Sequence, residues 1–417
     1  MDYSRVARKL RERIAGFSGE LSRGLPKTAQ RFVSEMLYGI QASQSVVLTK
    51  IGRMLEEEIP IKKIQERLCR QLMRDGLEGA IQRNLLKMAS GLIGKDTLLI
   101  LDPTDIRKKY AKSMQYLAGV RDGSEDEVGR GYWLLKVVAA EVEGDSMVPL
   151  VGRLYSSLAP GHVSENEEIL DVMDMVTGSV KKRGLWVIDR GGDRRNLLEP
   201  MLNREYRFLI RLIGNRNLIW DRQAVLASEI AKSCPCPYAE TVVKVEDGKE
   251  KVYHLEFGFR VVRLPGREEA LGMVIVKGFG AEPMMLLTTE PVRKSRKVLW
   301  RLVRAYIRRW AIEETIRVIK QSYDIEDVRV LGYRSLRNLM TLVLAASYFA
   351  AVVLDTGAKL KVMAGHILKA AKRVFGIPDF HYYAIADGLM SIFRRYPGRV
   401  HQIPKNLDQP SLLFQVT

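Results

Sequence analysis

A mixed α/β fold, helical at both ends, is predicted by three features of this 417-residue sequence. Residues 1–95 place apolar side chains at helical spacing. From residue 96, short and wholly apolar strands alternate with amphipathic helices, which indicates a mixed sheet with helices packed against it. Residues 215–293 contain short alternating strands separated by Gly and Pro, and helical patterns resume near residue 294.

The N-terminal region shows a helical pattern between residues 43 and 74. Val47, Ile51 and Leu55 follow one another at helical spacing, and a second set follows the break at Pro60. Two short basic helices around a bend suit a DNA-reading module. The same arrangement is common in plain helical domains, so both interpretations stay open.

Two of the predicted strands end in an acid. TLLILD (97–102) ends at Asp102 and LWVID (185–189) ends at Asp189. Between and after them the sequence predicts strands at 132–144, 147–157 and 206–212, and helices at 166–180 and 193–202. Residues 215–293 are expected to form a β-rich insertion rather than a continuation of the same sheet.

The C-terminal region is expected to be helical and to end in a loop-like tail. Its longest apolar run, residues 339–354, has sixteen residues, which is short of a membrane span and predicts a buried helix. The N-terminus is charged throughout and has no apolar signal core. We therefore expect a cytoplasmic protein without a membrane partner.

Net charge points to a polyanionic partner. The chain has 67 Lys and Arg against 49 Asp and Glu, a net charge of +18. So large an excess favours polyanions, of which nucleic acid is the commonest.

The three cysteines, Cys69, Cys234 and Cys236, are an odd number in a long chain, which argues for a reducing compartment. SCPCPY resembles half of a metal knuckle, but no second Cys/His pair stands nearby at zinc spacing. The sequence therefore favours a pair of reduced thiols in a proline-stiffened turn.

A basic helix is predicted over YIRRWAIEETIRVIK, residues 306–320. Tyr306, Arg309, Glu313 and Lys320 fall within roughly 60° of one another at 3.6 residues per turn. One narrow stripe thus presents a phenol, a guanidinium, a carboxylate and an ammonium. A solvated amphipathic face could show the same mixture.

The strand-end acids give this stripe a chemical context. Side chains at the ends of neighbouring strands converge at one edge of a sheet, and a carboxylate there is costly unless a cation pairs with it. Asp102, Asp189 and Glu313 together would repel, and a divalent metal such as Mg²⁺ would offset that repulsion. The alternative is that the aspartates cap helices or bind backbone amides.

Basic side chains around Glu313 then have a role of their own. Between Arg293 and Arg337 the chain carries thirteen Lys and Arg against five Asp and Glu. That density fits a surface that follows a DNA backbone past the metals.

These residues resemble a known family. The spacing Y-x2-R-x3-E-x6-K, met by Tyr306, Arg309, Glu313 and Lys320, is the signature of bacterial insertion-sequence DDE transposases, of which the Tn-five transposase is a relative. MMLLTTEPV followed by VLWRLVRAYIRRWAIEE resembles the approach to their signature helix. LDPT and VIDRGGD resemble the segments around their first and second aspartates. The resemblance covers about residues 96 to 345.

The resemblance implies an RNase H-like catalytic core that holds Asp102, Asp189 and Glu313 and is interrupted by the β-strand insertion. It implies Mg²⁺ or Mn²⁺ as cofactor. It also implies double-stranded DNA partners, namely terminal inverted repeats bound by a homodimer and a target to which the cut ends are joined. Asp105 could also be the first acid, but Asp102 fits D-x-T at the predicted strand end, and Asp105 is expected to cap the basic segment that follows.

Further DNA contacts follow from the same resemblance. Tyr306, Arg309 and Lys320 would contact phosphates near the cut. Studied relatives cleave through a hairpin and place a base-flipping tryptophan just before the MLLT-like segment, where this chain has Met284. A methionine can wedge between bases but stacks less strongly than an aromatic ring.

Other functions on the same pattern are a structure-selective nuclease or junction resolvase, a non-catalytic DNA-binding remnant of a transposase, and a metal-free basic scaffold. The β insertion and the signature helix argue against the first, and the presence of all three acids argues against the second. The predicted regions are a helical DNA-binding region at 1–95, the core at 96–214, the insertion at 215–293, the signature helix at 294–345 and a helical region with a tail at 346–417.

Overall fold

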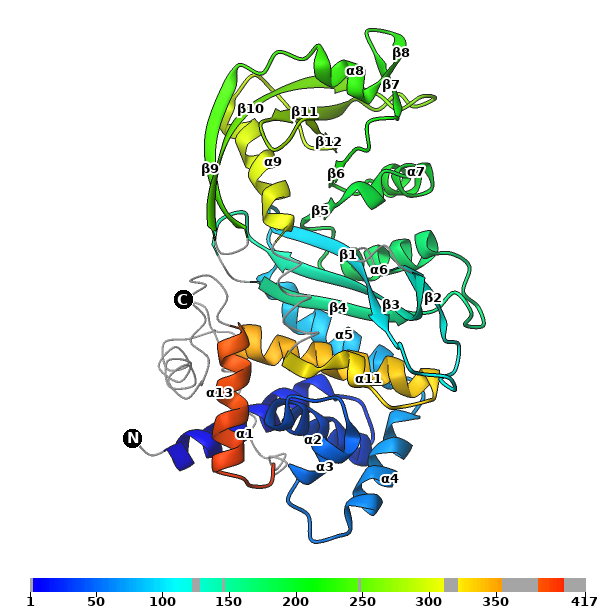
Figure 1. Ribbon diagram of the computed structural model, residues 1–417, viewed down its shortest axis with the longest axis vertical. Helices are drawn as coiled ribbons and strands as arrows, with labels where there is room; N and C mark the ends of the chain where they lie inside the picture. Colours follow the sequence, from blue (N-terminus) through cyan, green and yellow to red (C-terminus); the bar gives the residue numbers. More distant parts are fainter. Residues whose placement is uncertain are drawn as a thin grey trace.

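The computed structural model describes residues 3–121, 128–144, 147–246, 249–310, 322–354 and 382–400. In these residues the chain forms a large mixed sheet with helices on both faces, and a helical layer lies at one end of it (Figure 1). The predicted mixed α/β class is confirmed.

The helical layer contains the N-terminal region, as predicted. Pro60 separates α3 from α4, as its missing N–H and fixed backbone angle lead one to expect. Later helices pack onto the same layer, and Gln41 of α2 donates to the carbonyl of Ala346, 305 residues away. The elements are α1 (Tyr3–Leu21), α2 (Lys27–Ser43), α3 (Leu48–Arg53), α4 (Ile61–Leu72), α5 (Leu77–Ala89), η1 (Ser90–Leu92), η3 (Ile325–Asp327), α11 (Tyr333–Tyr348), the π-helical turn η4 (Phe349–Val353) and α13 (Tyr382–Arg395).

The long apolar helix belongs to this layer. Tyr333–Val353 is long and apolar enough to cross a membrane by composition, but 94% of its most apolar window is buried inside the protein. It packs between the N-terminal helices and the sheet (Figure 1). The prediction of a buried core helix is confirmed.

The sheet runs in the order β2-β3-β1-β5-β6-β12-β11-β10-β9, and β4 pairs with β3. β1, β5 and β6 are parallel to one another, and the remaining pairings are antiparallel. Its strands are β1 (Leu98–Arg107), β2 (Ala118–Arg121), β3 (Val128–Ala140), β4 (Met147–Tyr155), β5 (Leu185–Ile188), β6 (Phe208–Arg211), β9 (Tyr238–Glu246), β10 (Lys249–Val262), β11 (Leu271–Lys277) and β12 (Met284–Thr288), and β7 (Asn217–Trp220) and β8 (Gln223–Leu226) form a separate hairpin.

The insertion extends this sheet, and the expectation of a sheet of its own is wrong. β12 pairs with β6 through Leu286–Arg211, Leu287–Ile210 and Thr288–Leu209, and β11, β10 and β9 follow in turn. β12 is wholly buried, so its side chains need cover on both faces, which a central place in one large sheet provides.

β1 is longer than its sequence suggested. It pairs with β5 only through Leu101, where β5 ends, and continues to Arg107 against β3 alone. Asp102 therefore lies inside β1, at the point where its parallel neighbour stops. Pro103 follows in the part that has a partner on one side only, where its missing N–H costs no ladder bond.

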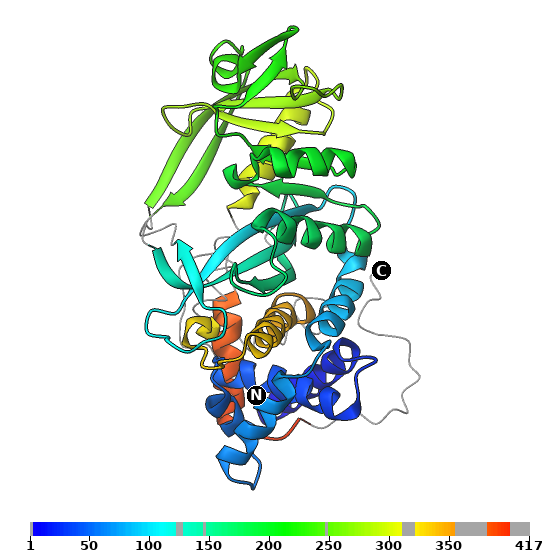
Figure 2. The same cartoon turned by 90° about the vertical axis from the view of Figure 1, so that its right-hand side faces the viewer.

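Helices cover the two faces of the sheet separately. α6 (Glu165–Ser179) and α7 (Arg195–Asn203) lie on one face, and α9 (Arg296–Arg309) lies on the other (Figures 1 and 2). Ser164 begins α6 by accepting from the N–H of Glu167, and three glutamates in the first turn suit the positive end of the helix dipole. The short α8 (Ala227–Lys232) adjoins the separate hairpin.

α9 packs against strands of the core and of the insertion. Leu299, Leu302 and Val303 pack with the buried residues of β1, β5 and β11 in one core cluster. Phe257 of the insertion stacks on Trp300 of α9 with 5.6 Å between ring centroids. The insertion therefore covers the helix that carries the predicted signature.

A buried carboxylate fixes the start of α9 to the sheet. Glu290, two residues after β12, accepts hydrogen bonds from Arg207 at 2.8 and 2.9 Å and from Arg301 of α9 at 2.9 Å. Burial raises the pKa of Glu290, but the hydrogen bonds and charges of the two arginines outweigh it and hold the pKa below its ordinary value.

Replacement of Glu290 by Gln should destabilise the fold, because two arginines would lose their carboxylate. We expect the free energy of unfolding to fall by about 1.5–3 kcal/mol, measured by urea denaturation at neutral pH. Glu205→Gln is a suitable control. Its side chain is 84% exposed and lies 3.9 Å from Lys182, so the change should be within about 0.5 kcal/mol.

The same carboxylate predicts acid sensitivity. A group whose folded pKa is lowered contributes stability above its unfolded pKa of about 4.3, and this is lost as the pH falls through the folded pKa. The difference in stability between wild type and Glu290→Gln should shrink as the pH is lowered through this range. A constant difference would contradict the ionised state of Glu290.

Candidate active site

Asp102 and Asp189 lie next to each other on neighbouring parallel strands. Leu101 of β1 pairs with Ile188 of β5, so the two aspartates occupy the next position of the same register. Adjacent strands are about 4.8 Å apart. Side chains alternate along each strand, so both aspartates share the face of Ile100 and Val187, which is the face covered by α9.

Asp189 is fixed by the backbone that follows it. Its Oδ1 accepts from the N–H of Gly191 at 2.7 Å and caps the short helix η2 (Arg190–Gly192). A Cβ at position 191 would lie 2.9 Å from Oδ1, which is too close. Only glycine therefore allows the carboxylate to occupy this position. Asp189 thus caps a short helix, which was the alternative to metal binding in the sequence analysis. The cap uses only Oδ1, and Oδ2 takes no part in it.

Arg309 approaches Asp102 from α9. Its Nη1 lies 3.8 Å from Oδ1, and the two side chains are only 8% and 18% exposed. The guanidinium also lies over the ring of Tyr306, 5.5 Å from its centroid. The phenol and the guanidinium of the stripe are therefore in contact, and the guanidinium faces the first predicted acid.

Glu313 and Lys320 lie outside the described residues. In the described part of the chain no group of three or more His, Cys, Asp or Glu side chains is placed to hold a metal. The carboxylates of the two aspartates fit a divalent metal such as Mg²⁺, because they supply hard oxygen ligands from two neighbouring strands on one face of the sheet. α9 packs over that face. The third ligand remains a prediction.

Lys136 is a candidate residue that the sequence analysis missed. It lies on β3 directly opposite Asp102, in the register that also pairs Val138 with Ile100, and it is 1% exposed. Directly opposite residues share a face with about 5 Å between Cβ atoms, so the register puts a second basic residue on the same sheet face as Asp102. The available signal was a single Lys inside the apolar run YWLLKVVAA.

Asp105 occupies a different place from the one expected. It lies within β1 opposite Trp133 and is 8% exposed, so it belongs to the strand and not to the segment after it. Three positions separate it from Asp102, which puts the two carboxyl groups on opposite faces. Asp102 is therefore the one that shares a face with Asp189.

Two residues predicted to contact DNA, Met284 and Tyr306, have buried side chains. Met284 pairs with Val276 and is 3% exposed, inside the core between the sheet and α9. Tyr306 is 1% exposed in the same core. Both lie on surfaces where sheet and helix meet, so neither presents a side chain to a partner in this structure.

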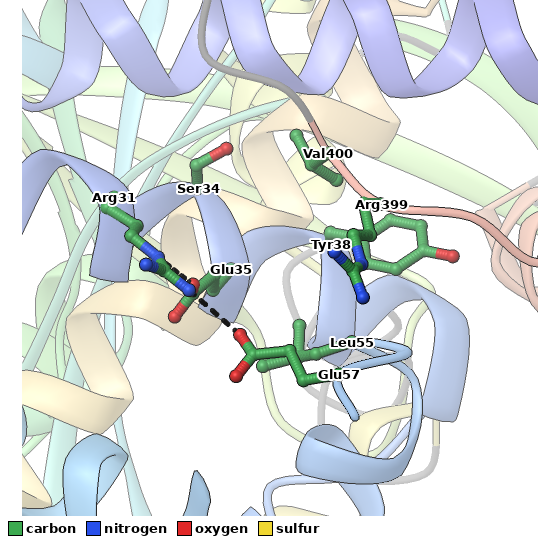
Figure 3. Close-up of a pocket in the computed structure, with 8 residues that line it drawn as sticks. All are labelled: Arg31, Ser34, Glu35, Tyr38, Leu55, Glu57, Arg399 and Val400. Carbon is green, nitrogen blue, oxygen red and sulfur yellow. Dashed lines mark hydrogen bonds and ion pairs between the residues drawn. The ribbon is translucent and has the colours of Figure 1, made fainter. Parts of the chain in front are cut away.

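A separate cavity of about 280 Å³ lies in the N-terminal layer (Figure 3). Its charges are satisfied internally, since Arg31 binds Glu35 and Glu57 at 2.5 and 2.9 Å. Arg67 binds the same two carboxylates. This network joins helices of the layer and shares no element with Asp102, so we assign it a structural role.

The cysteine pair lies between α8 and β9. Cys234 is buried, and the hydrogen bond with Cys236, with help from the nearby Arg260 and Lys277, lowers the pKa of its thiol to about 7 against the opposing effect of burial. The described residues place no cluster of metal-binding side chains around the pair.

Comparisons with known proteins identify a family for the chain. The model of a family described as the transposase DDE domain matches residues 93–349, more than half of the chain. No curated protein matches the chain. Among solved structures, a piggyBac transposase synaptic complex with hairpin DNA is similar at 11% identity and a TM-score of 0.39, covering 97% of this chain and 84% of that one.

Replacement of Gly191 by Ala should displace the Asp189 carboxylate with little loss of stability. The nearest atom to the new methyl is the end of a flexible side chain, so the carboxylate shifts instead of the backbone. We expect metal-dependent DNA cleavage to fall at least tenfold, because a ligand displaced by about 1 Å costs that much or more.

Gly178→Ala is the matched control, because a Cβ there meets nothing within 4 Å and the site lies on α6. It should leave cleavage unchanged and stabilise the helix by up to about 1 kcal/mol. Unchanged cleavage by Gly191→Ala would show that the position of the Asp189 carboxylate does not matter.

Proposed function

The chain belongs to the transposase DDE domain family, metal-dependent enzymes that cut and join DNA, and on that premise we propose its reaction and site. The protein binds the inverted-repeat ends of an insertion sequence, cleaves them, and joins the 3′ ends to target DNA. Asp102, Asp189 and Glu313 are its catalytic acids.

The observation that carries this proposal is the shared face of the two aspartates. Parallel pairing of β1 and β5 puts Asp102 beside Asp189, and α9 brings Arg309 to the same place. α9 ends at Arg309, four residues before Glu313. The family match supports a DNA-cutting reaction. The adjacent positions of two aspartates on one face of the sheet support the same reaction.

We propose that Asp102, Asp189 and Glu313 hold Mg²⁺, with Mn²⁺ as a substitute. Bound there, divalent metal activates the attacking oxygen and stabilises the leaving one in phosphodiester displacement. Asp189 is oriented by the N–H of Gly191, which fixes one oxygen and leaves the other for a ligand. Arg309 and Lys136 balance the charge of the carboxylates.

Assignment to the Tn-five-like group with an RNase H-like core is part of the proposal. It is supported by the Y-R-E-K spacing and by two acids on adjacent parallel strands. Arg309 and Lys320 are proposed phosphate contacts near the cut. Tyr306 instead supports Arg309 through the face of its ring, and Met284 has no part in the proposal.

The proposed partners are double-stranded DNA and a second copy of the chain in the DNA complex. Residues 1–95 are proposed to contact the inverted repeat, since exposed basic side chains such as Lys62, Lys63 and Arg70 line α4. The proposed location is the cytoplasm, on nucleoid DNA.

Purified protein, Mg²⁺ and DNA that carries the element's own ends test the reaction directly. Nicks, hairpins and joined products are scored on sequencing gels. Asp102→Asn, Asp189→Asn and Glu313→Gln should each lower cleavage by at least a thousandfold while binding of the ends persists, because each removes a proposed metal ligand.

Asp105→Asn is the control for the choice of first acid, and it should keep most of its cleavage activity. Normal cleavage by Asp102→Asn would refute that choice. Cleavage by the wild type without joined products would favour a nuclease, and binding without cleavage would favour a DNA-binding remnant.

Lys136→Met should make the site bind metal more tightly. In the wild type, the buried ammonium beside Asp102 opposes a second cation, and methionine fills the space without charge. We expect the Mg²⁺ concentration needed for a given rise in unfolding temperature to fall about tenfold, which corresponds to ~1.4 kcal/mol.

The same titration on Lys136→Met combined with Asp102→Asn should show no such gain, because the carboxylate that binds the metal is gone. An equal Mg²⁺ dependence in the wild type and Lys136→Met would overturn the role of Lys136. This measurement follows stability alone and needs no DNA.

A further inference from the structure

A second feature lies farther along the strand that carries Asp102. A cleft of about 930 Å³ opens at the end of β1, between residues 107–114 and residues 326–331 before α11. Arg107, the last residue of β1, lines it. One continuous strand therefore joins the cleft to the candidate active site.

The cleft is strongly basic. Among the described residues, six cationic side chains line it against two acidic ones, Glu326 and Asp327. Asp327 is already bound by Arg329 at 3.1 Å and by Lys50 at 3.6 Å. The remaining excess of positive charge fits an anionic ligand.

Lys108 connects the two walls of the cleft. Its Nζ donates to the carbonyls of Glu326 and Val328 at 2.5 and 2.7 Å, which ties the end of β1 to the opposite wall. Burial lowers the pKa of this lysine. Lys108 is thus part of the framework of the cleft.

Three other cations face outward. Lys109, Lys112 and Arg130 are exposed and form no side-chain hydrogen bond or ion pair with another described residue. Between the two lysines, the ring of Tyr110 is 85% exposed. An exposed aromatic ring among unengaged cations is the combination that binds an unpaired nucleic-acid strand, by stacking on a base and neutralising phosphates.

The size of the cleft also favours one strand. About 930 Å³ is the volume of a pocket for a small ligand, roughly 300–1,000 Å³, which suits a few nucleotides but not both strands of a helix. From Asp102 to Arg107 the strand rises about 17 Å, the length of about five stacked nucleotides.

We propose that this cleft binds an unpaired DNA strand that extends past the cleaved phosphodiester, with Lys109, Lys112 and Arg130 on its phosphates and Tyr110 against a base. The inference rests on the proposed function, because the strand must be delivered by DNA bound at Asp102. It adds a substrate requirement: strand separation next to the cut, for about five nucleotides.

The test compares two DNA substrates, each an element end with an unpaired extension beyond the cut site. One extension has about eight nucleotides and can reach the cleft, and the other has about two and cannot. Binding is measured by fluorescence anisotropy in Ca²⁺ and cleavage in Mg²⁺. The wild type should bind the longer extension at least tenfold more tightly. Lys109→Glu with Lys112→Glu should abolish that difference and lower the salt slope by about 1.4.

Tyr110→Ala should lose about tenfold in affinity for the longer extension, and Tyr110→Phe should keep it, because stacking needs the ring and not the hydroxyl. Lys181→Glu with Lys182→Glu is the matched control. It makes the same charge change on two exposed lysines before β5, which lie at the opposite end of the parallel strands from the cleft, and should preserve the length preference.

The proposal is overturned if wild type shows no length preference, if a paired extension gives the same gain as an unpaired one, or if the Lys109 and Tyr110 variants keep that gain. Failure of the proposed function looks different, since the wild type would then cleave neither substrate in Mg²⁺. Circular dichroism and unfolding temperature confirm that each variant is folded.

Discussion

The parallel pairing of β1 with β5 is the constraint on which the candidate site depends. Their register places Asp102 beside Asp189 and turns both toward α9. A slip of one residue would move Asp102 to the opposite face, away from Arg309. That register is protected by burial, because Leu98–Leu101 and all of β5 are buried between helices on both faces.

The insertion contributes to the site through α9. By extending the sheet beyond β6, it provides the surface on which α9 lies, and Phe279 contacts Trp310 edge-to-face at the end of that helix. Glu290 fixes the helix start to the same sheet through Arg301. A helix held at both ends positions Arg309 more precisely than one held in its middle, so the insertion has a structural role independent of DNA.

The sequence predicted local features well and long-range partners poorly. The acid after β5, the N-terminal helices and the buried apolar helix follow from periodicity over a few residues, and the structure has them. That β1 continues past Asp102 depends on β3, and that the insertion joins the main sheet depends on β6; neither partner is close in sequence. Burial of Tyr306 and Met284 was missed for the same reason, since a helical stripe does not show which element covers it.

The cations around Asp102 connect stability with the proposed catalysis. In the protein alone, Arg309 lies 3.8 Å from the Asp102 carboxylate and Lys136 lies opposite Asp102 in the strand register, so basic side chains already offset part of the carboxylate charge. Arg309 lies 3.8 Å from one oxygen of Asp102, so the other oxygen can be a metal ligand while the guanidinium stays beside the carboxylate. On the proposed function, a metal held by Asp102 would reduce the pull of the carboxylate on Arg309, and an adjacent phosphate is the anion that the guanidinium could then bind. Metal and DNA would each make the binding of the other easier, which ties loading of the site to the presence of substrate.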